Sequence, residues 1–250
     1  MKALITGASS GIGRDLARSL AARGCALILT ARREDRLRAL AEELPVPAKV
    51  LPADLADRAQ VQALYEAVRG EDIDILVNNA GRGLFGPFDE TSLEEELAML
   101  DVNISALHIL MKRFLPDLKA RGRGHILNVA SSAAFLPGPL LSSYYASKAY
   151  VLRLSEAVAE ELRRSGSGVK ISVLCPGPVS TEFDQRAGVS FSLPALQSQA
   201  VAEYAVTRML QGKLLIIPGA GMKTVHVLQR LAPDKLLARI CWHVQRRKQG

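Results

Sequence analysis

Three side chains between residues 131 and 148 have the types and the spacing of an acid–base site. Ser131 precedes Tyr144 by thirteen residues, and Lys148 follows Tyr144 by four. If Tyr144 opens a helix, this separation places its phenol and the Lys148 ammonium on one helix face, about one turn apart. A free phenol has a pKa of about 10, and an adjacent cation favours its ionised form. The spacing therefore predicts a proton donor or acceptor that works near neutral pH.

Two other interpretations of this segment stay open at the level of sequence. A YxxxK pair can arise by chance at a helix start rich in Ser and Tyr, with the lysine solvated. In addition, Ser132 and Tyr145 repeat the thirteen-residue spacing, but Ala149 rather than a lysine follows Tyr145 by four residues. We therefore predict that Tyr144 is the functional phenol.

The chain around these residues has the pattern of an α/β fold. Apolar runs alternate with helix-period stretches, and runs without polar alternation indicate strands buried on both faces. The sequence predicts a doubly wound parallel sheet of about seven strands with helices on both faces. We expect residues 1–221 to form this single domain and residues 222–250 to form a basic C-terminal extension. The strands are expected near residues 2–6, 26–30, 48–51, 73–78, 124–130, 169–175 and 213–217.

A glycine-rich turn, TGASSGIG, lies between the first expected strand and an amphipathic helix pattern. Glycines let the backbone turn tightly, and the free N–H groups and dipole at the helix N-terminus attract a pyrophosphate. A purely structural turn is the alternative, but the strand–turn–helix context favours dinucleotide binding. The residues predicted to bind the cofactor here are Gly7, Ser9, Ser10, Gly11, Ile12 and Gly13.

The end of the second expected strand indicates which dinucleotide is preferred. Dinucleotide folds use an acidic side chain at this point to hold the adenosine ribose hydroxyls. This chain has Arg32 and Arg33 instead. A guanidinium suits a 2′-phosphate, so we predict that Arg32, with Arg33, selects NADP over NAD. The alternative is that both belong to a charged helix start.

Composition and charge indicate a single globular domain and argue against a nucleic-acid-binding protein. The 250 residues are 48% hydrophobic and 23% charged, which suits one globular α/β domain. The net charge is +7, but residues 222–250 hold seven Lys and Arg against one Asp, so residues 1–221 carry only +1. The body therefore makes no electrostatic case for nucleic acid binding.

The remaining composition points to the cytoplasm. Cys25, Cys175 and Cys241 lie far apart without metal-like spacing, which favours free thiols in a reducing cytosol over disulfides or a metal site. The first residues lead directly into an expected strand, and no apolar run approaches the ~18 residues of a membrane span. The chain has no GxSxG motif, which argues against a Ser-His-Asp hydrolase, and we expect His108 and His125 to be structural.

Taken together, the motifs resemble those of the short-chain dehydrogenase/reductase family. TGASSGIG, NNAG at 78–81, DVN at 101–103, Ser131, and Tyr144 with Lys148 follow one another in that family's order and approximate spacing. The chain looks like a member of the NADP-preferring branch with a Rossmann-type fold, and the match covers roughly residues 3–218.

The resemblance implies a role for each motif. Tyr144 would protonate the developing alkoxide, or deprotonate an alcohol in the reverse direction. Lys148 would lower the pKa of Tyr144 and bind the nicotinamide ribose, Ser131 would hold the substrate oxygen, and Asn103 would steady a proton-relaying water. For Asn78 a structural role at the sheet is the alternative. The further cofactor contacts implied are Asp54, Leu55, Asn78, Ala80, Gly81, Tyr144, Lys148, Pro176, Gly177, Val179 and Thr181.

Two loops suggest the kind of substrate. Both contain more apolar residues than exposed loops need, which predicts a lid over a hydrophobic carbonyl or alcohol. Packing on the protein's own body or on a second subunit is an equal alternative. The family resemblance implies a homo-oligomer paired through the helices after Ser92 and Tyr144. A non-catalytic NADP(H) sensor is the competing function. The apolar loop residues are Leu84, Phe85, Pro87 and Phe88, and Phe183, Val189, Phe191, Leu193, Pro194 and Leu196.

The C-terminal extension has a helical period after Pro233. Its apolar residues share one face, and its cations and Trp242 lie on another. We favour packing of the apolar stripe on the enzyme body or a sister subunit. The alternative is that the segment rests on an anionic membrane surface. The stripe consists of Leu236, Leu237, Ile240, Cys241 and Val244, and the cations are Lys235, Arg239 and Arg246.

Overall fold

A seven-stranded parallel sheet forms the centre of the molecule in the computed structural model, which describes residues 1–183 and 195–246. The strand order is β3-β2-β1-β4-β5-β6-β9. Successive strands are added on one side of β1 up to β3 and on its other side from β4 onward, so the strand order reverses between β1 and β4. Every neighbouring pair is parallel. The strands are β1 (Lys2–Thr6), β2 (Ala26–Thr30), β3 (Ala48–Val50), β4 (Ile75–Asn78), β5 (Gly124–Val129), β6 (Val169–Leu174) and β9 (Leu215–Ile216). The predicted doubly wound α/β fold is confirmed, and each expected strand contains an observed one.

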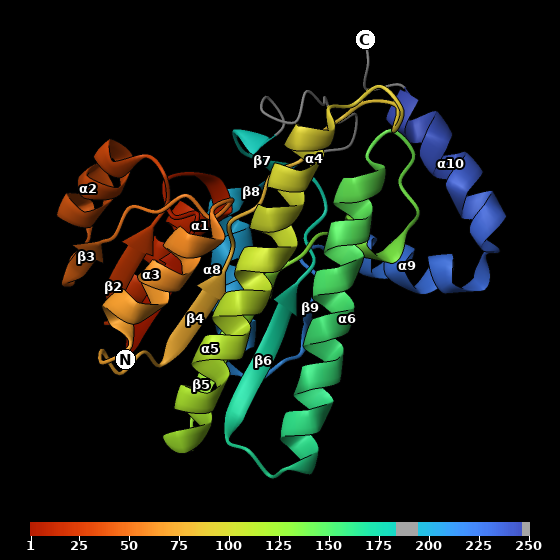
Figure 1. Ribbon diagram of the computed structural model, residues 1–250. Coiled ribbons are helices and arrows are strands. Elements are labelled where there is room, and N and C mark those ends of the chain that lie inside the picture. Colours follow the sequence, from red (N-terminus) through yellow and green to blue (C-terminus); the bar gives the residue numbers. More distant parts are fainter. Residues whose placement is uncertain (184–194, 247–250) are drawn as a thin grey trace.

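Helices cover both faces of this sheet (Figure 1). One apolar layer joins the sheet to α3, α5 and α6, and the other joins it to α1, α2 and α8. Consecutive strand residues face opposite layers: Leu4 packs in the first and Ile5 in the second, and both are fully buried. This explains the apolar runs without alternation. The helices are α1 (Gly11–Ala21), α2 (Glu34–Glu43), α3 (Arg58–Val68), α4 (Leu93–Leu100), α5 (Leu107–Ala120), α6 (Ser142–Arg164), α8 (Ser198–Leu210), α9 (Ala220–Leu228) and α10 (Asp234–Arg246).

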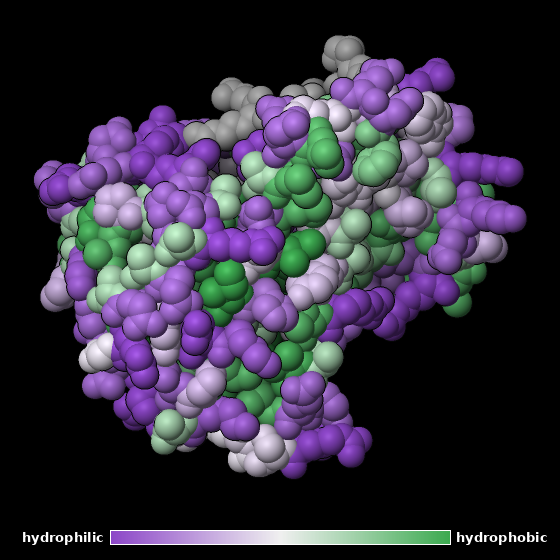
Figure 2. All heavy atoms as spheres, in the orientation of Figure 1, coloured by the Kyte–Doolittle hydropathy of each residue, from purple (hydrophilic) through white to green (hydrophobic). Residues whose placement is uncertain are grey.

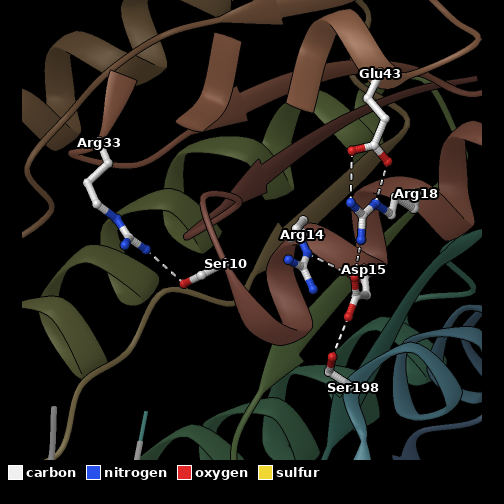
Figure 3. Close-up of polar contacts among 7 residues, drawn as sticks. All are labelled: Ser10, Arg14, Asp15, Arg18, Arg33, Glu43 and Ser198. Atoms are coloured by element: carbon white, nitrogen blue, oxygen red, sulfur yellow. Dashed lines mark hydrogen bonds and ion pairs between the residues drawn. The ribbon is translucent and has the colours of Figure 1, made fainter. Parts of the chain in front are cut away.

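A buried carboxylate on α1 fixes the helix that follows the glycine-rich turn. Asp15, only 4% exposed, accepts hydrogen bonds from Arg14, Arg18 and the hydroxyl of Ser198 at the start of α8. Arg18 also binds both carboxylate oxygens of Glu43 on α2, at 2.7 and 2.8 Å (Figure 3). These contacts tie α1 to two neighbouring helices, so the turn before α1 has a fixed position.

The connection between α4 and α5 is a π-helical segment, Asp101–Ala106. It contains the DVN triplet, and the wider turn changes the direction in which its side chains point relative to a regular helix. The sequence pattern did not indicate this irregularity.

The C-terminal extension forms two helices joined at residues 229–233. The predicted domain boundary at residue 221 falls within α9, which begins at Ala220. The ring of His226 on α9 lies 4.1 Å from that of Phe135, in a 3₁₀ turn (Ser132–Phe135) after β5. The extension therefore packs beside the loop that carries Ser131. A separate pair of two-residue strands, β7 (Val179–Ser180) and β8 (Leu196–Gln197), flanks residues that lie outside the described part of the chain.

Candidate active site

A cavity of about 760 Å³ lies at the carboxyl ends of the central strands. This is where open parallel sheets bind ligands, at the point where the strand order reverses. Most of the predicted site residues line it, whereas Asn78 and Asn103 do not. Those at the cavity are Gly7, Ser9, Ser10, Gly11, Ile12, Gly13, Arg32, Arg33, Asp54, Leu55, Ala80, Gly81, Ser131, Tyr144, Lys148, Pro176, Gly177, Val179 and Thr181.

Tyr144 and Lys148 lie on one face of α6, one turn apart. α6 begins at Ser142, so both residues belong to its first two turns. The Lys148 Nζ atom lies 5.8 Å from the centre of the Tyr144 ring and donates a hydrogen bond to the Val129 carbonyl at 3.1 Å. Lys148 is only 4% exposed, and this burial lowers its pKa from 10.5 to about 8. An ammonium with so little water around it interacts strongly with neighbouring oxygens.

Asn103 lies in the π-helical segment, behind the cavity wall. Its amide donates hydrogen bonds to the carbonyl of Arg82 at 2.9 Å and to the hydroxyl of Ser147 at 3.0 Å, and its Oδ1 accepts one from the Arg82 N–H. A Cβ atom added to Gly81 would lie 3.1 Å from the Lys148 Nζ and 3.3 Å from the Asn103 Oδ1. Asn103 and Lys148 therefore meet beside Gly81.

The structure separates the two serine–tyrosine pairs. Ser131 and Ser132 both line the cavity, but the backbone N–H of Ser132 donates to the Pro176 carbonyl at 2.8 Å. The Ser131 hydroxyl accepts a hydrogen bond from the Ala133 N–H at 3.1 Å. The hydroxyl of Tyr145 accepts one from Gln245 on α10, and burial raises the pKa of Tyr145. Tyr145 thus joins the C-terminal helix, whereas Tyr144 is the tyrosine beside a lysine.

The glycine-rich turn forms a cradle that side chains would fill. Gly7 has a φ of +65°, which a side chain rarely adopts. A Cβ atom on Gly13 would lie 2.3 Å from both the Asn79 Nδ2 atom and the Gly7 carbonyl oxygen. Ser10 precedes α1, and its side chain makes no capping hydrogen bond to that helix. Uncapped N–H groups at a helix N-terminus, next to a glycine backbone, suit a pyrophosphate.

The two arginines after β2 have different surroundings. Arg33 donates hydrogen bonds to Ser9 at 3.2 Å and Ser10 at 2.9 Å and pairs with Glu182 at 3.0 Å, so it lies over the glycine-rich turn (Figure 3). The Arg32 side chain is 61% exposed, with its Nη1 atom 4.0 Å from the Asp54 carboxylate. One guanidinium therefore lies at the glycine-rich turn and the other near Asp54, and both line the cavity.

Asn78 turns away from the cavity. Its amide donates to the Asn128 side chain at 2.9 Å, and Asn128 in turn donates to Ser155 on α6. This contact agrees with the alternative considered for Asn78, a structural role at the sheet, rather than with a cofactor contact. Asn79, which the sequence analysis did not select, lines the cavity and donates to the carbonyls of Thr6 and Gly7. Both residues belong to the NNAG motif. The motif therefore indicated this strand end, but it did not indicate that the second asparagine faces the cavity.

The rest of the cavity is an apolar chamber next to Tyr144. The ring of Phe183 lies 5.4 Å from that of Tyr144, and Leu84 lines the same space. Phe88 is 68% exposed, and Leu196, in β8, packs against the apolar layer of α1, α2 and α8, so these two do not form a lid in the described structure. Val189, Phe191, Leu193 and Pro194 lie outside the described residues.

The C-terminal extension supplies a wall of this chamber that the sequence analysis missed. Gln245 is 1% exposed, and its Oε1 atom has no hydrogen-bond partner among residues 1–183 and 195–246. Its neighbour one turn earlier, Cys241, is also buried. The helical period of the extension was the signal, but it did not indicate what the buried face contacts. The wall consists of Met222, Val225, Ile240, Cys241, Val244 and Gln245.

A Rossmann-type sheet, a glycine-rich turn and a Tyr–Lys pair at one cavity define a nicotinamide-dependent oxidoreductase. The sequence profile described as short chain dehydrogenase matches residues 1–189. The chain belongs to this family of oxidoreductases.

Its relatives include enzymes and structures with either nicotinamide cofactor. The chain is 33% identical to the NADP-dependent 3-hydroxy acid dehydrogenase YdfG of Salmonella typhi, over 81% of this chain and 86% of that protein. A short-chain dehydrogenase of Sphingobium yanoikuyae in complex with NADPH is 32% identical and has a TM-score of 0.82, covering 94% of this chain and 99% of that one. One from Burkholderia phymatum in complex with NAD is 27% identical, with a TM-score of 0.84 and 92% of each chain covered.

Proposed function

We propose that this protein interconverts a carbonyl and a secondary alcohol on a hydrophobic small molecule, with NADP(H) as its cofactor. The observation that carries this proposal is the position of Tyr144 and Lys148 between the glycine cradle and the apolar chamber. A phenol placed there reaches a substrate oxygen from the side of the chamber. A non-catalytic sensor needs no such phenol beside a buried lysine.

NADP is proposed as the cofactor because of the residues after β2. Arg32 and Arg33 stand where NAD-binding folds place an acidic side chain, and both line the cavity. A guanidinium forms charge-assisted hydrogen bonds with a phosphate, whereas a carboxylate would repel it. When bound, the cofactor supplies or accepts the hydride. Gly7, Gly11 and Gly13 let the backbone approach its pyrophosphate.

The side chains around the reacting carbonyl have separate tasks. Tyr144 donates its proton to the oxygen that becomes an alkoxide and removes it in the reverse reaction. The Lys148 ammonium stabilises the ionised phenol and so lowers the pKa of Tyr144. Ser131 holds the substrate oxygen. Asn103, fixed by Arg82 and Ser147, steadies water at Gly81 and orients the groups that exchange protons with Lys148.

The chamber favours an apolar substrate. Its lining includes Leu84, Leu136, Leu141 and Phe183 together with the apolar residues of α9 and α10. An acyl chain, a steroid-like ring or an aromatic ketone would bury its surface there.

A panel of carbonyl compounds tests the proposal. A 3-oxoacyl thioester, a steroid ketone and an aromatic ketone are each mixed with protein and NADPH, and the loss of NADPH absorbance is followed. Cofactor binding is measured in parallel by fluorescence. We expect turnover of at least one apolar ketone. NADPH binding without turnover of any ketone, and of the matching alcohols with NADP, would favour the sensor instead.

We also propose that the protein is a homo-oligomer. Large apolar side chains are exposed on α4 and α6, the helices after Ser92 and near Tyr144: Leu93 is 65% exposed, Leu97 52% and Tyr150 37%. Burial against a second copy would remove this apolar surface from water. Sedimentation velocity should show a dimer or a tetramer, and a monomer at micromolar concentration would contradict the proposal.

A further inference from the structure

Exposed apolar side chains gather on the α9–α10 hairpin. Of the thirteen large hydrophobic residues that are exposed among residues 1–183 and 195–246, eight lie between Val225 and Val244. Leu231, between the two helices, is 81% exposed. Single exposed apolar residues are ordinary, but a gathering of this kind marks an interaction surface. The eight are Val225, Val227, Leu228, Leu231, Leu236, Ile240, Trp242 and Val244.

Packing on the enzyme body does not account for this surface. α10 contacts the body through Cys241 and Gln245, which are one turn apart and both buried. Leu236, Ile240 and Val244 form the neighbouring stripe and are 48%, 50% and 44% exposed. The helix is docked, yet about half of the surface of Leu236, Ile240 and Val244 remains in water.

The charge of the hairpin indicates what covers it. Residues 222–246 carry five Lys and Arg against one Asp, whereas residues 1–221 carry only +1. In a symmetric contact between two copies the same cations would face each other, and this repulsion opposes self-association through the hairpin. A surface with anionic groups and an apolar interior fits both the positive charge and the exposed apolar side chains of the hairpin. The cations would pair with its anionic groups, and the apolar side chains would be buried in its interior.

We propose that the α9–α10 hairpin binds the surface of an anionic lipid bilayer. The two helices have 9 and 13 residues, fewer than the ~20 that cross a bilayer, so the hairpin would lie in the interfacial plane. Trp242 is 41% exposed and lies among the cations, on the side of α10 away from Leu236, Ile240 and Val244. α9 and α10 extend beyond α6 at one end of the molecule, which leaves them accessible to a flat surface (Figure 1). In Figure 2 long hydrophilic side chains project from this region beside hydrophobic residues.

Docking in this way would bring the cavity to the lipid. Val225, Ile240 and Val244 line the cavity and are also about half exposed, so they form an apolar rim at its edge. A lipophilic substrate could then pass from the bilayer into the chamber without crossing water. The docking itself does not depend on the proposed activity.

Vesicle binding tests the proposal without any substrate. The full-length protein is mixed with vesicles of phosphatidylglycerol and phosphatidylcholine, or of phosphatidylcholine alone, at low and at molar salt. Trp242 is the only tryptophan of the chain, so its fluorescence reports on the hairpin directly. We expect co-sedimentation with the anionic vesicles at low salt only, together with a change in Trp242 fluorescence. No binding to anionic vesicles at low salt would overturn the proposal.

Two sets of substitutions identify the surface. Lys235→Gln with Arg239→Gln should reduce partitioning about 25-fold at low salt, because each cation near an anionic surface contributes about fivefold. Leu228→Ser, Leu231→Ser and Leu236→Ser together should reduce it at least about tenfold through lost apolar burial. None of these residues lines the cavity, so NADPH binding and thermal stability should stay unchanged.

Matched controls separate this surface from general effects. Lys112→Gln with Lys119→Gln removes the same charge from exposed positions on α5 and should preserve binding. The three leucines changed to Met should also preserve it. If the Gln and Ser variants bind like the wild type, the hairpin is not the docking surface. If the Ser variants instead lower the oligomeric mass, the hairpin is a subunit interface and the proposal fails.

Discussion

At the scale of single residues, the environment of each tyrosine separates two similar phenols. Tyr144 lies beside the buried ammonium of Lys148, whereas Tyr145 bonds to Gln245 in an apolar setting that raises its pKa. An acid–base group needs a pKa near the working pH, and a nearby cation lowers the pKa of a phenol whereas apolar burial raises it.

Replacing these tyrosines one at a time tests the assignment. Tyr144→Phe should lower kcat by about 10² to 10⁴ while NADPH binding and the fold persist, because only the transferable proton is lost. Tyr145→Phe should retain most turnover. The measurement is NADPH consumption with the best ketone of the panel. An active Tyr144→Phe together with an inactive Tyr145→Phe would contradict the assignment.

Arg32 provides a test of cofactor choice. Arg32→Ala should weaken NADPH binding far more than NADH binding, because hydrogen bonds to charged groups contribute roughly 1.5 to 3 kcal/mol. Dissociation constants for both nucleotides are measured by fluorescence titration. Arg33→Ala is the comparison, since Arg33 also holds Ser10 and Glu182. Equal losses for NADPH and NADH in Arg32→Ala would mean that Arg32 does not bind the 2′-phosphate.

The buried Lys148 makes stability depend on pH in a defined direction. Its pKa in the folded protein is about 8, below the ordinary 10.5, so the unfolded chain binds more protons between these values. Stability contributed by this site therefore rises as pH increases from about 8 to 10.5. Lys148→Met removes the buried charge, so the variant should be the more stable protein near neutral pH. The difference in unfolding free energy, measured in urea, should shrink towards pH 10.5, and a difference that stays constant would contradict the pKa shift.

At the scale of elements, local backbone geometry places the groups that we propose hold the cofactor. The glycine-rich turn leads from β1 into α1, and Asn79 at the end of β4 bonds to the turn through the carbonyls of Thr6 and Gly7. The turn and the end of β4 therefore form one unit, in which Gly13 leaves the space that Asn79 occupies.

Gly13→Ala tests this close approach. The new methyl group would lie 2.3 Å from the Asn79 side chain and the Gly7 carbonyl, so the turn must shift. We expect a lower melting temperature, by several degrees, and a large loss of NADPH affinity. Gly70→Ala is the control, because a methyl group there meets no atom within 4 Å. Wild-type NADPH affinity in Gly13→Ala would show that the turn is not constrained in this way.

At the scale of the whole molecule, the C-terminal hairpin completes a chamber that the parallel sheet leaves open. Met222 packs against Gly177, and Gln245 reaches Tyr145 across a hundred residues of sequence. The sheet and the glycine-rich turn line one half of the cavity, where we propose that the cofactor binds, and the hairpin lines the half proposed for the substrate.

Truncation after Pro218 separates these two halves. Without α9 and α10 the substrate KM should rise at least about tenfold through lost apolar contacts, while NADPH affinity changes little. Steady-state kinetics and cofactor titration measure the two effects. A parallel loss of NADPH binding would indicate that the hairpin supports the whole fold, whereas an unchanged KM would remove it from the substrate chamber.

The sequence alone determined the fold class and predicted the motifs of the site, because both are encoded locally. Apolar runs without alternation specify buried parallel strands, a strand–glycine–helix turn specifies a phosphate cradle, and a four-residue spacing places Tyr144 and Lys148 on one helix face. Only the tertiary structure decided which asparagine of NNAG faces the cavity, how Arg33 lies over Ser10, and what the C-terminal helix covers. These depend on strand register and on contacts between residues far apart in the chain, such as Tyr145 and Gln245. No local pattern encodes such contacts, because they form only when the whole molecule has packed.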